Sequence, residues 1–204
     1  MLRIVAVTAV LALVVPSSAM ADTGGGTTPV DDYLVSAGFT FTDHGISYAG
    51  NASVEDERIS GQRNGGFGFE GSGTSQLCDA GTPSDPSDDY TGTQIIDYSA
   101  SAVTVKAFQV DSALASGSFE LATSGRRITT DACSGAIIRS KSEHHRFKLQ
   151  LVASGAVTTT EDIVGPMTER FSMVDATGTG LLDRTGVQLT GGSLQHMEIF
   201  VSPV

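Results

Sequence analysis

Apolar side chains recur at every second position along most of this chain. One run extends from Tyr33 to Phe41 (YLVSAGFTF), and another extends from Phe147 to Leu151 (FKLQL). Because successive side chains of a β-strand point to opposite faces, this spacing predicts strands with one buried face. In SAVTVKAFQV the apolar phase shifts to Phe108 and Val110, which predicts a β-bulge. Further apolar runs lie at Phe67 and Phe69, Val103 to Ala107, Phe119 and Leu121, Ile137 and Ile138, Phe171 and Met173, Val187 and Leu189, and Met197 to Val201.

Short glycine-containing segments lie between these runs: DHG, RNGG, SGS, TSG, TGTG, RTG and GG. Glycine adopts positive φ without steric cost, so we expect turns at these segments. Helical periodicity is absent, and the strongest helix candidate, Thr160 to Arg170, is interrupted by Gly165 and Pro166. Nine or ten strands with frequent turns predict an all-β fold. We expect an antiparallel up-and-down β-barrel, lipocalin-like in architecture only, or, as second choice, a β-sandwich.

The first 21 residues have the three parts of a secretory signal peptide. Arg3 supplies a positive charge, Ile4 to Val15 form an apolar run, and Ala19 to Ala21 provide the small residues that a signal peptidase recognises. A membrane-spanning helix needs about 20 apolar residues, and Pro16 ends this run too early. We therefore expect cleavage after about Ala21, a secreted protein in the extracellular space, and no membrane span after cleavage.

The remaining chain is long enough for one domain with a core and too short for two. Residues 22–31 contain DTGGGTTP and are expected to form a flexible leader. Residues 32–204 are expected to form a single all-β domain.

The chain is acidic, with a formal net charge of −11 and only three lysines. Proteins bind nucleic acids and anionic membrane surfaces through Lys and Arg side chains that neutralise phosphates. The charge therefore predicts that nucleic acid is not a partner.

The chain contains two cysteines, Cys78 and Cys133. An even number in an exported chain predicts one disulfide, and the lack of CxxC spacing disfavours the alternatives of free thiols or a redox pair. Cys78 opens the segment CDAGTPSDPSDDY, which we interpret as a loop pinned at its first residue. The segment from Asp79 to Asp89 offers carboxylate oxygens, which calcium prefers, but it lacks the EF-hand pattern. A solvated acidic loop is the simpler interpretation, and the question of calcium binding stays open.

Two of the four histidines, His144 and His145, are adjacent in the segment SEHHR. Extending the strand of Phe147 to Leu151 backward places His145 on the inward face and His144 on the outward face. Such a pair cannot easily bind one ion, and zinc needs three or four ligands, so a second strand would have to supply His44 or His196. We therefore interpret the pair as a solvated strand entry, and we assign no metal ligand, cofactor-binding residue or catalytic residue.

Two further motifs have ordinary structural interpretations. Asp43 to Gly45 (DHG) has the composition of a hairpin turn, although an acid–base pair is the alternative. Gly66 to Gly71 matches GxGxxG, but the dinucleotide fingerprint requires a helix that begins within it, and Phe67 and Phe69 predict a strand there. His196 and Glu198 share one strand face, so a histidine–carboxylate pair is conceivable.

Recognisable catalytic motifs are missing: the sequence has no GxSxG, HExxH or P-loop. We therefore favour a non-enzymatic, secreted β-domain that binds a small ligand, a surface polymer or a protein. A secreted enzyme, a hydrolase or isomerase on a β-barrel scaffold, is the alternative, with His44, His145 and His196 as the first residues to test. A structural or surface-coat protein is the third hypothesis. A filled apolar interior would favour binding, and inward polar groups in a deep cavity would favour the enzyme.

Overall fold

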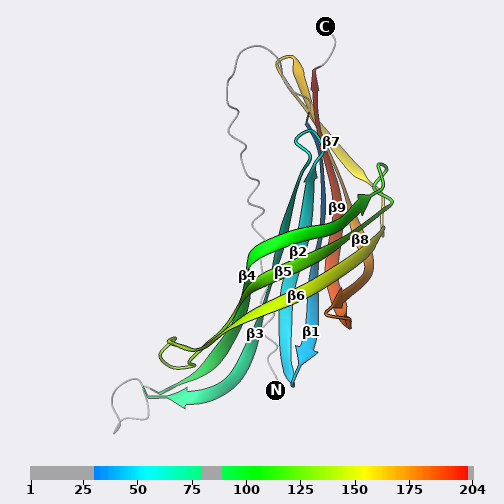
Figure 1. Cartoon of the computed structure of the whole chain (residues 1–204). Coiled ribbons are helices and arrows are strands. Elements are labelled where there is room, and N and C mark those ends of the chain that lie inside the picture. The colour runs from blue at the N-terminus through cyan, green and yellow to red at the C-terminus, as the bar shows by residue number, and fades with distance from the viewer. Residues whose placement is uncertain (1–29, 80–88, 202–204) are drawn as a thin grey trace.

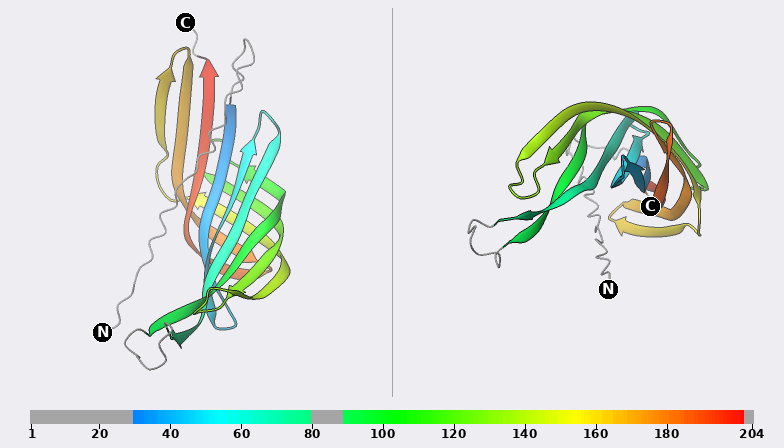
Figure 2. Two further views of the ribbon diagram at one scale, coloured as in Figure 1. Left: turned by 90° about the vertical axis from the view of Figure 1, so that its left-hand side faces the viewer. Right: turned by 90° about the horizontal axis from the view of Figure 1, so that it is seen from below.

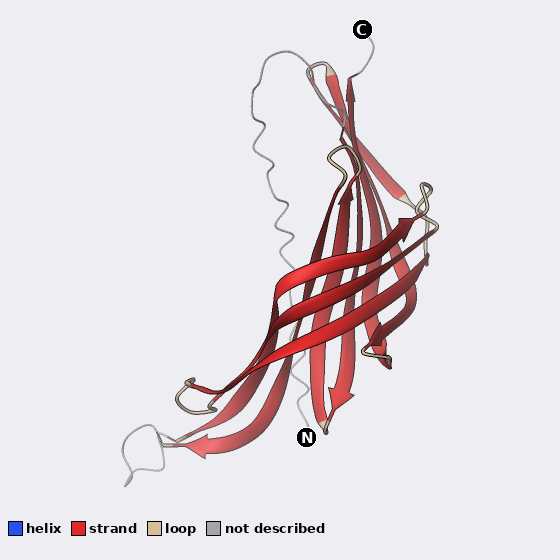
Figure 3. Cartoon of the chain, viewed as in Figure 1, coloured by secondary structure: helices blue, strands red, loops and turns tan. Residues whose placement is uncertain are grey.

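The computed structural model describes residues 30–79 and 89–201, and every regular element within them is a β-strand (Figure 3). The expected signal peptide and most of the expected leader lie outside the described residues. The described part of the chain has no helix long and apolar enough to cross a membrane. The nine strands are β1 (Val30–Asp43), β2 (Ile46–Glu57), β3 (Gln62–Cys78), β4 (Tyr90–Val110), β5 (Ser116–Thr130), β6 (Ile137–Ala153), β7 (Thr158–Val164), β8 (Met167–Leu182) and β9 (Thr185–Val201).

The nine strands form one antiparallel sheet, in the order β6-β5-β4-β3-β2-β1-β9-β8-β7. β1 pairs with β9, and the second half of β6 pairs with the second half of β8, so the sheet closes in a ring (Figure 1, Figure 2). The β6–β8 contact, which we call the seam, consists of seven residue pairs from Phe147↔Leu182 to Ala153↔Ala176. The expected all-β, antiparallel fold is confirmed.

β7 lies outside the ring, because it pairs with the first half of β8 and with no other described strand. The first half of β6, residues 137–146, likewise pairs with β5 alone among the described strands. The two ends of the sheet therefore join only over the seven residue pairs of the seam. β6 and β7 each keep a free edge, and these edges lie at opposite ends of the molecule (Figure 1).

Inward side chains fill the centre of the ring. β1, β3 and β6 contribute Phe39, Phe67 and Phe147, whose ring centroids lie 4.8 to 5.7 Å apart. Leu121 and Leu194 are fully buried beside them. Burial of each such side chain contributes about 2 kcal/mol to stability. The inward faces expected for the runs at 33–41 and 147–151 are confirmed.

Several glycine segments that we expected to form turns lie inside strands instead. RNGG lies in β3, SGS and TSG in β5, TGTG in β8 and GG in β9, so these five predictions are wrong. Most of these glycines provide space: a Cβ at Gly65 would lie 2.7 Å from Val103 Cγ1, and one at Gly178 would overlap the Gln150 carbonyl across the seam. DHG is a turn as expected, with positive φ at His44 and Gly45.

Three other local predictions have clear outcomes. The bulge expected in β4 is confirmed by a register shift between Val105 and Ala107. The helix candidate at Thr160 to Arg170 is the β7–β8 hairpin, whose turn contains Gly165 at positive φ. β1 already begins at Val30, two residues before the expected start of the domain.

Cys78, at the end of β3, and Cys133, in the turn between β5 and β6, form a disulfide, which confirms the expected pairing. Tyr90, the first residue of β4, donates its hydroxyl hydrogen to the Cys133 carbonyl at 2.9 Å. Asp131 Oδ1 accepts hydrogen bonds from the Cys133 and Ser134 amides and stabilises the turn. The β5–β6 turn is thus held against the β3–β4 hairpin.

Candidate functional site

One end of the ring carries a pocket with a volume of about 840 Å³, which we call the mouth pocket. Its lining comes from the β1–β2 turn and the start of β2, from Ile96 of β4, from β5 and from the first half of β6. The lining residues are Asp43, His44, Ile46, Tyr48, Ile96, Arg127, Thr129, Arg139, Lys141, Ser142, Glu143, His144 and His145. Much of this set is charged, in contrast to the apolar centre of the ring.

The register of β5 and β6 explains why these side chains meet. Arg127 pairs with Lys141, and Thr123 pairs with His145. Side chains two residues apart share a face of a strand, so Arg139, Lys141, Glu143 and His145 all point inward. Polar alternation in β6 thus continues the inward face of the ring beyond its apolar centre.

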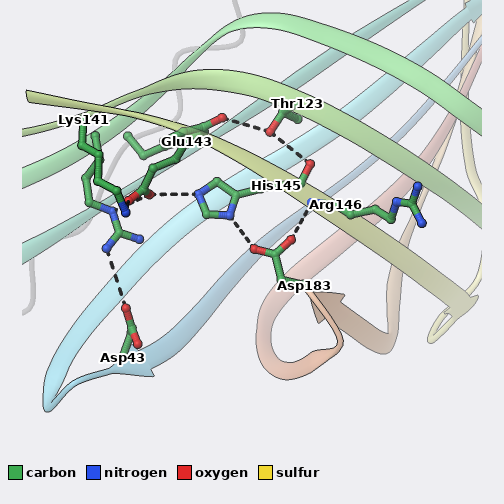
Figure 4. A network of polar contacts seen from close by, with 9 residues as sticks. Asp43, Thr123, Lys141, Glu143, His145, Arg146 and Asp183 are labelled. Carbon is green, nitrogen blue, oxygen red and sulfur yellow. Dashed lines mark hydrogen bonds and ion pairs between the residues drawn. The ribbon is translucent and has the colours of Figure 1, made fainter.

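His145 is held between two carboxylates (Figure 4). Its Nδ1 lies 2.6 Å from Asp183 Oδ2, and its Nε2 lies 3.3 Å from Glu143 Oε2. The side chain is only 10% exposed, and the ring of Tyr98 packs against it at 4.7 Å between centroids. Asp183 comes from the β8–β9 turn and also accepts a hydrogen bond from the Arg146 amide at 2.7 Å. The orientation of the imidazole is therefore fixed.

Glu143 is the centre of the charged cluster. Arg127 Nε lies 2.9 Å from its Oε2, and Lys141 Nζ lies 3.1 Å from its Oε1. Burial raises the pKa of Glu143, but the Lys141 hydrogen bond and the charges of Arg127, Lys141 and His145 outweigh burial, so the pKa lies below its ordinary value. Glu143 is therefore an anion at neutral pH and a poor candidate for a general acid.

Arg127 lies between aromatic rings and carboxylates. Its guanidinium carbon is 5.6 Å from the centroid of Tyr48 and 5.5 Å from that of Phe69, and Nη1 lies 3.7 Å from Asp43 Oδ2. Arg139, by contrast, makes no ion pair with any described residue and is exposed. The mouth pocket thus contains one fixed and one free guanidinium group.

Three buried atoms of the cluster have contacts at ion-pair distance without hydrogen-bond alignment: Arg127 Nε, Glu143 Oε2 and His145 Nε2. Buried polar atoms usually have aligned partners, because desolvation without a hydrogen bond is costly. The arrangement therefore retains hydrogen-bonding capacity at the base of the pocket.

The structure separates the two adjacent histidines as the alternation predicted. His145 points inward, and His144 points outward, with Nδ1 2.8 Å from Ser124 Oγ. The interpretation as a strand entry is wrong, because β6 begins at Ile137. The expectation that the pair is solvated holds for His144, which is exposed, and fails for His145, whose side chain is largely buried. The seven residues before the pair are mostly polar, so no apolar period marked this part of the strand.

The remaining two histidines lie at opposite ends of the ring. His44 is 93% exposed in the β1–β2 turn, at the rim of the mouth pocket. His196 stacks on Tyr33 with 4.0 Å between centroids, and its Nε2 lies 2.8 Å from Asp31 Oδ1. Glu198 is more distant, at 3.9 Å, so the nearer carboxylate partner of His196 is Asp31. The three candidate histidines therefore do not form one site.

Two questions about ligands depend partly on residues outside the described ranges. Within the described residues, no group of three His, Cys, Asp or Glu side chains could hold a metal ion. Most of the acidic loop for which calcium binding was considered, residues 80–88, lies outside the described residues. The GxGxxG match lies inside β3, a strand, as we expected.

Sequence reasoning identified His145 and missed the charged residues that surround it. Arg127, Glu143 and Asp183 come from three different elements, and Asp183 is 38 residues from His145. The polar alternation RSKSEH in β6 was the available signal for Arg139, Lys141 and Glu143. Asp183 had no local signal beyond its place beside a turn.

Comparisons with known proteins identified no relative. No family model matches the chain, no curated protein matches it, and no solved structure matches its fold.

Proposed function

We propose that this protein is an exported binding domain, built as an up-and-down β-barrel, that holds an oxyanion-bearing ligand in its mouth pocket. Carboxylates and sulfates, as on small organic acids or acidic surface glycans, are the ligand class. The observation that carries the proposal is the exposed guanidinium of Arg139, which has no ion pair among the described residues. It lies in a pocket where three cations, Arg127, Arg139 and Lys141, outnumber two carboxylates, Asp43 and Glu143, although the net charge of the chain is −11. Guanidinium groups bind such oxyanions through paired hydrogen bonds.

The barrel interpretation is supported by the closure of the sheet along the seam and by the meandering strand order. The packed centre favours binding at the mouth over binding in the interior, since bulky side chains occupy the space within the ring. Export is supported by the signal-peptide pattern and agrees with the disulfide.

Titration calorimetry with sodium glucuronate and inorganic sulfate tests the proposal, with glucose as the neutral control. We expect heat from the anions only, and weaker affinity at higher salt. Arg139→Gln should lower affinity about tenfold, because a hydrogen bond to a charged group contributes about 1.5 kcal/mol. Arg126→Gln is the matched control, because Arg126 neighbours Arg127 in sequence and points outward. Equal losses in the two variants, or no heat at millimolar anion, would refute the proposal.

A secreted hydrolase or isomerase is the second candidate, and one observation favours it. The contact of His145 Nδ1 with Asp183 at 2.6 Å is the arrangement that orients a catalytic imidazole. Against this candidate, His145 Nε2 faces Glu143, and among the described residues no serine or cysteine side chain forms a hydrogen bond with the His145 imidazole. The inward polar groups at the mouth favour an enzyme, whereas the filled apolar centre of the ring favours a binding protein.

A further inference from the structure

Several strand segments of the described chain pair on one side only, among them β7, the first half of β6 and residues 72–78 of β3. β7 pairs with β8 on one side only, and all seven of its residues are exposed. β6 pairs with β5 alone over its first half. A free edge presents unpaired amide and carbonyl groups, which are a template for a further strand.

On β6, the neighbouring turn shows which backbone groups face the free edge. Asp183 donates its amide hydrogen to the Arg146 carbonyl at 2.9 Å, and the Arg146 amide donates to Asp183 Oδ1. The backbone groups of Arg146 therefore face the seam side of β6. Because backbone direction alternates along a strand, Ser142 and His144 present theirs on the same side, at the free edge.

On β7, the hairpin turn gives the same information. Gly165 and Pro166 form a two-residue turn, and Val164↔Met167 is the pair that flanks it. The flanking pair of a two-residue hairpin is a hydrogen-bonded pair, and such pairs alternate with non-bonded ones. Thr159, Glu161 and Ile163 therefore direct their backbone groups away from β8.

Charge distinguishes the three ways in which two copies could join through the free edges of β6 and β7. β7 carries two carboxylates, Glu161 and Asp162, and Glu161 already contacts Arg170 of β8. The first half of β6 is basic, because three cations, Arg139, Lys141 and Arg146, outnumber its one carboxylate, Glu143. Pairing β7 with β7, or β6 with β6, brings like charges together, which opposes association. Pairing β7 with β6 brings an acidic segment beside a basic one and adds contacts near Ile163, which is 72% exposed.

We propose that β7 of one copy adds to the free edge of β6 of a second copy, which makes a head-to-tail contact. The two edges lie at opposite ends of the molecule (Figure 1). After one contact forms, the first copy still has a free β6 edge and the second copy still has a free β7 edge. Further copies can therefore add at both ends, and the assembly has no fixed size. The contact requires no ligand, and it uses the same segment of β6 that lines the mouth pocket, including Arg139 and Lys141.

Sedimentation equilibrium on the purified protein tests this contact. We expect the average mass to pass that of a dimer between about 10 and 500 µM, the range of small, weak interfaces. Ser142→Pro and Thr159→Pro each remove one amide that faces a free edge and leave the ladder to the paired strand intact. Each variant alone should stay monomeric. Their equimolar mixture should stop at a dimer, because only one competent β7–β6 contact remains.

Ser142→Ala and Thr159→Ala are the matched controls and should associate like the wild type. Hydrogen exchange on the wild type needs no variant: the Ser142 and Thr159 amides should gain protection as concentration rises. A monomeric wild type at 500 µM would overturn the proposal. Dimers of Thr159→Pro alone would indicate β6–β6 pairing, dimers of Ser142→Pro alone would indicate β7–β7 pairing, and either result also overturns it.

Discussion

Asp32 illustrates how one carboxyl group can lower the stability of this fold. It lies on the outer face of β1, paired in register with Glu57, and Glu55 lies two residues from Glu57 on the same face of β2. Burial, followed by repulsion from Glu57, Glu55 and Asp31, raises the pKa of Asp32 to about 6, and His196 only partly offsets this. The folded protein therefore holds a proton here more tightly than the unfolded chain does.

The sign of the pH dependence follows from this raised pKa. Between about pH 4 and pH 6 the folded state binds more protons at Asp32, so its contribution to stability falls as pH rises. Asp32→Asn should increase the free energy of unfolding by about 1 kcal/mol at pH 7.5, a figure reduced for solvent screening. Near pH 4 the gain should vanish. Urea unfolding followed by circular dichroism at both pH values measures the difference.

Asp162→Asn is the control for Asp32→Asn, because it removes the same formal charge from an exposed residue of β7. A gain for Asp32→Asn that stayed constant from pH 4 to pH 7.5 would contradict the argument. Equal gains for the two variants would show that net charge, and not the local cluster, is responsible.

At the scale of elements, Gly178 controls how closely β8 approaches β6 at the seam. It pairs with Leu151, and an added Cβ would overlap the Gln150 carbonyl oxygen. Gly178→Ala should therefore lower the free energy of unfolding by about 2 kcal/mol, a typical cost of overpacking. Because backbone cannot move aside as a flexible side chain can, we also expect faster hydrogen exchange in residues 147–153.

Gly186→Ala is the matched control for Gly178→Ala. Gly186 also lies in a strand, β9, but nothing lies within 4 Å of the position that its Cβ would occupy. This variant should unfold at the wild-type urea concentration or slightly above it. If the two alanine variants were equally stable, close packing at the seam would not be the reason for glycine at position 178.

At the scale of the whole molecule, the disulfide connects two hairpins across 55 residues of sequence. Closing a loop of this size stabilises a fold by about 4 kcal/mol on the chain-entropy model, and measured losses are about 2 to 5 kcal/mol. Replacing Cys78 and Cys133 together by alanine should lower the free energy of unfolding by that order. The reduced wild-type protein, measured in dithiothreitol, should unfold at the same urea concentration as the double variant. An unchanged midpoint in both would contradict the prediction.

Local patterns predicted well those features that depend on neighbouring residues. Alternation identified the inward faces around Phe39 and Phe147 and the opposite directions of His144 and His145, because side-chain direction in a strand is a local property. Glycine was misread, since a glycine that opens a turn and one that makes room for another strand look alike in sequence. Gly178 shows the difference: its requirement comes from Gln150, 28 residues earlier in the chain and on a strand that closes the ring.

The candidate site could be predicted only in part, for the same reason. Arg139, Lys141 and Glu143 share a face by local alternation, and that face was available from sequence. The contact of His145 with Asp183 depends on β6 and β8 meeting at the seam. No pattern within either strand specifies that pairing.

The pairing of β1 with β9 joins the first and last strands of the described chain, and Asp31 meets His196 across 165 residues. β9 is synthesised after every other described strand, so the ring can close only once all nine described strands have been made. Until β9 is present, the edges of β1 and β8 that it covers can pair with wrong strands. Contacts between such remote residues also slow folding, because a long loop must close before they form. The order of synthesis therefore makes β9 the element that decides when this protein becomes native.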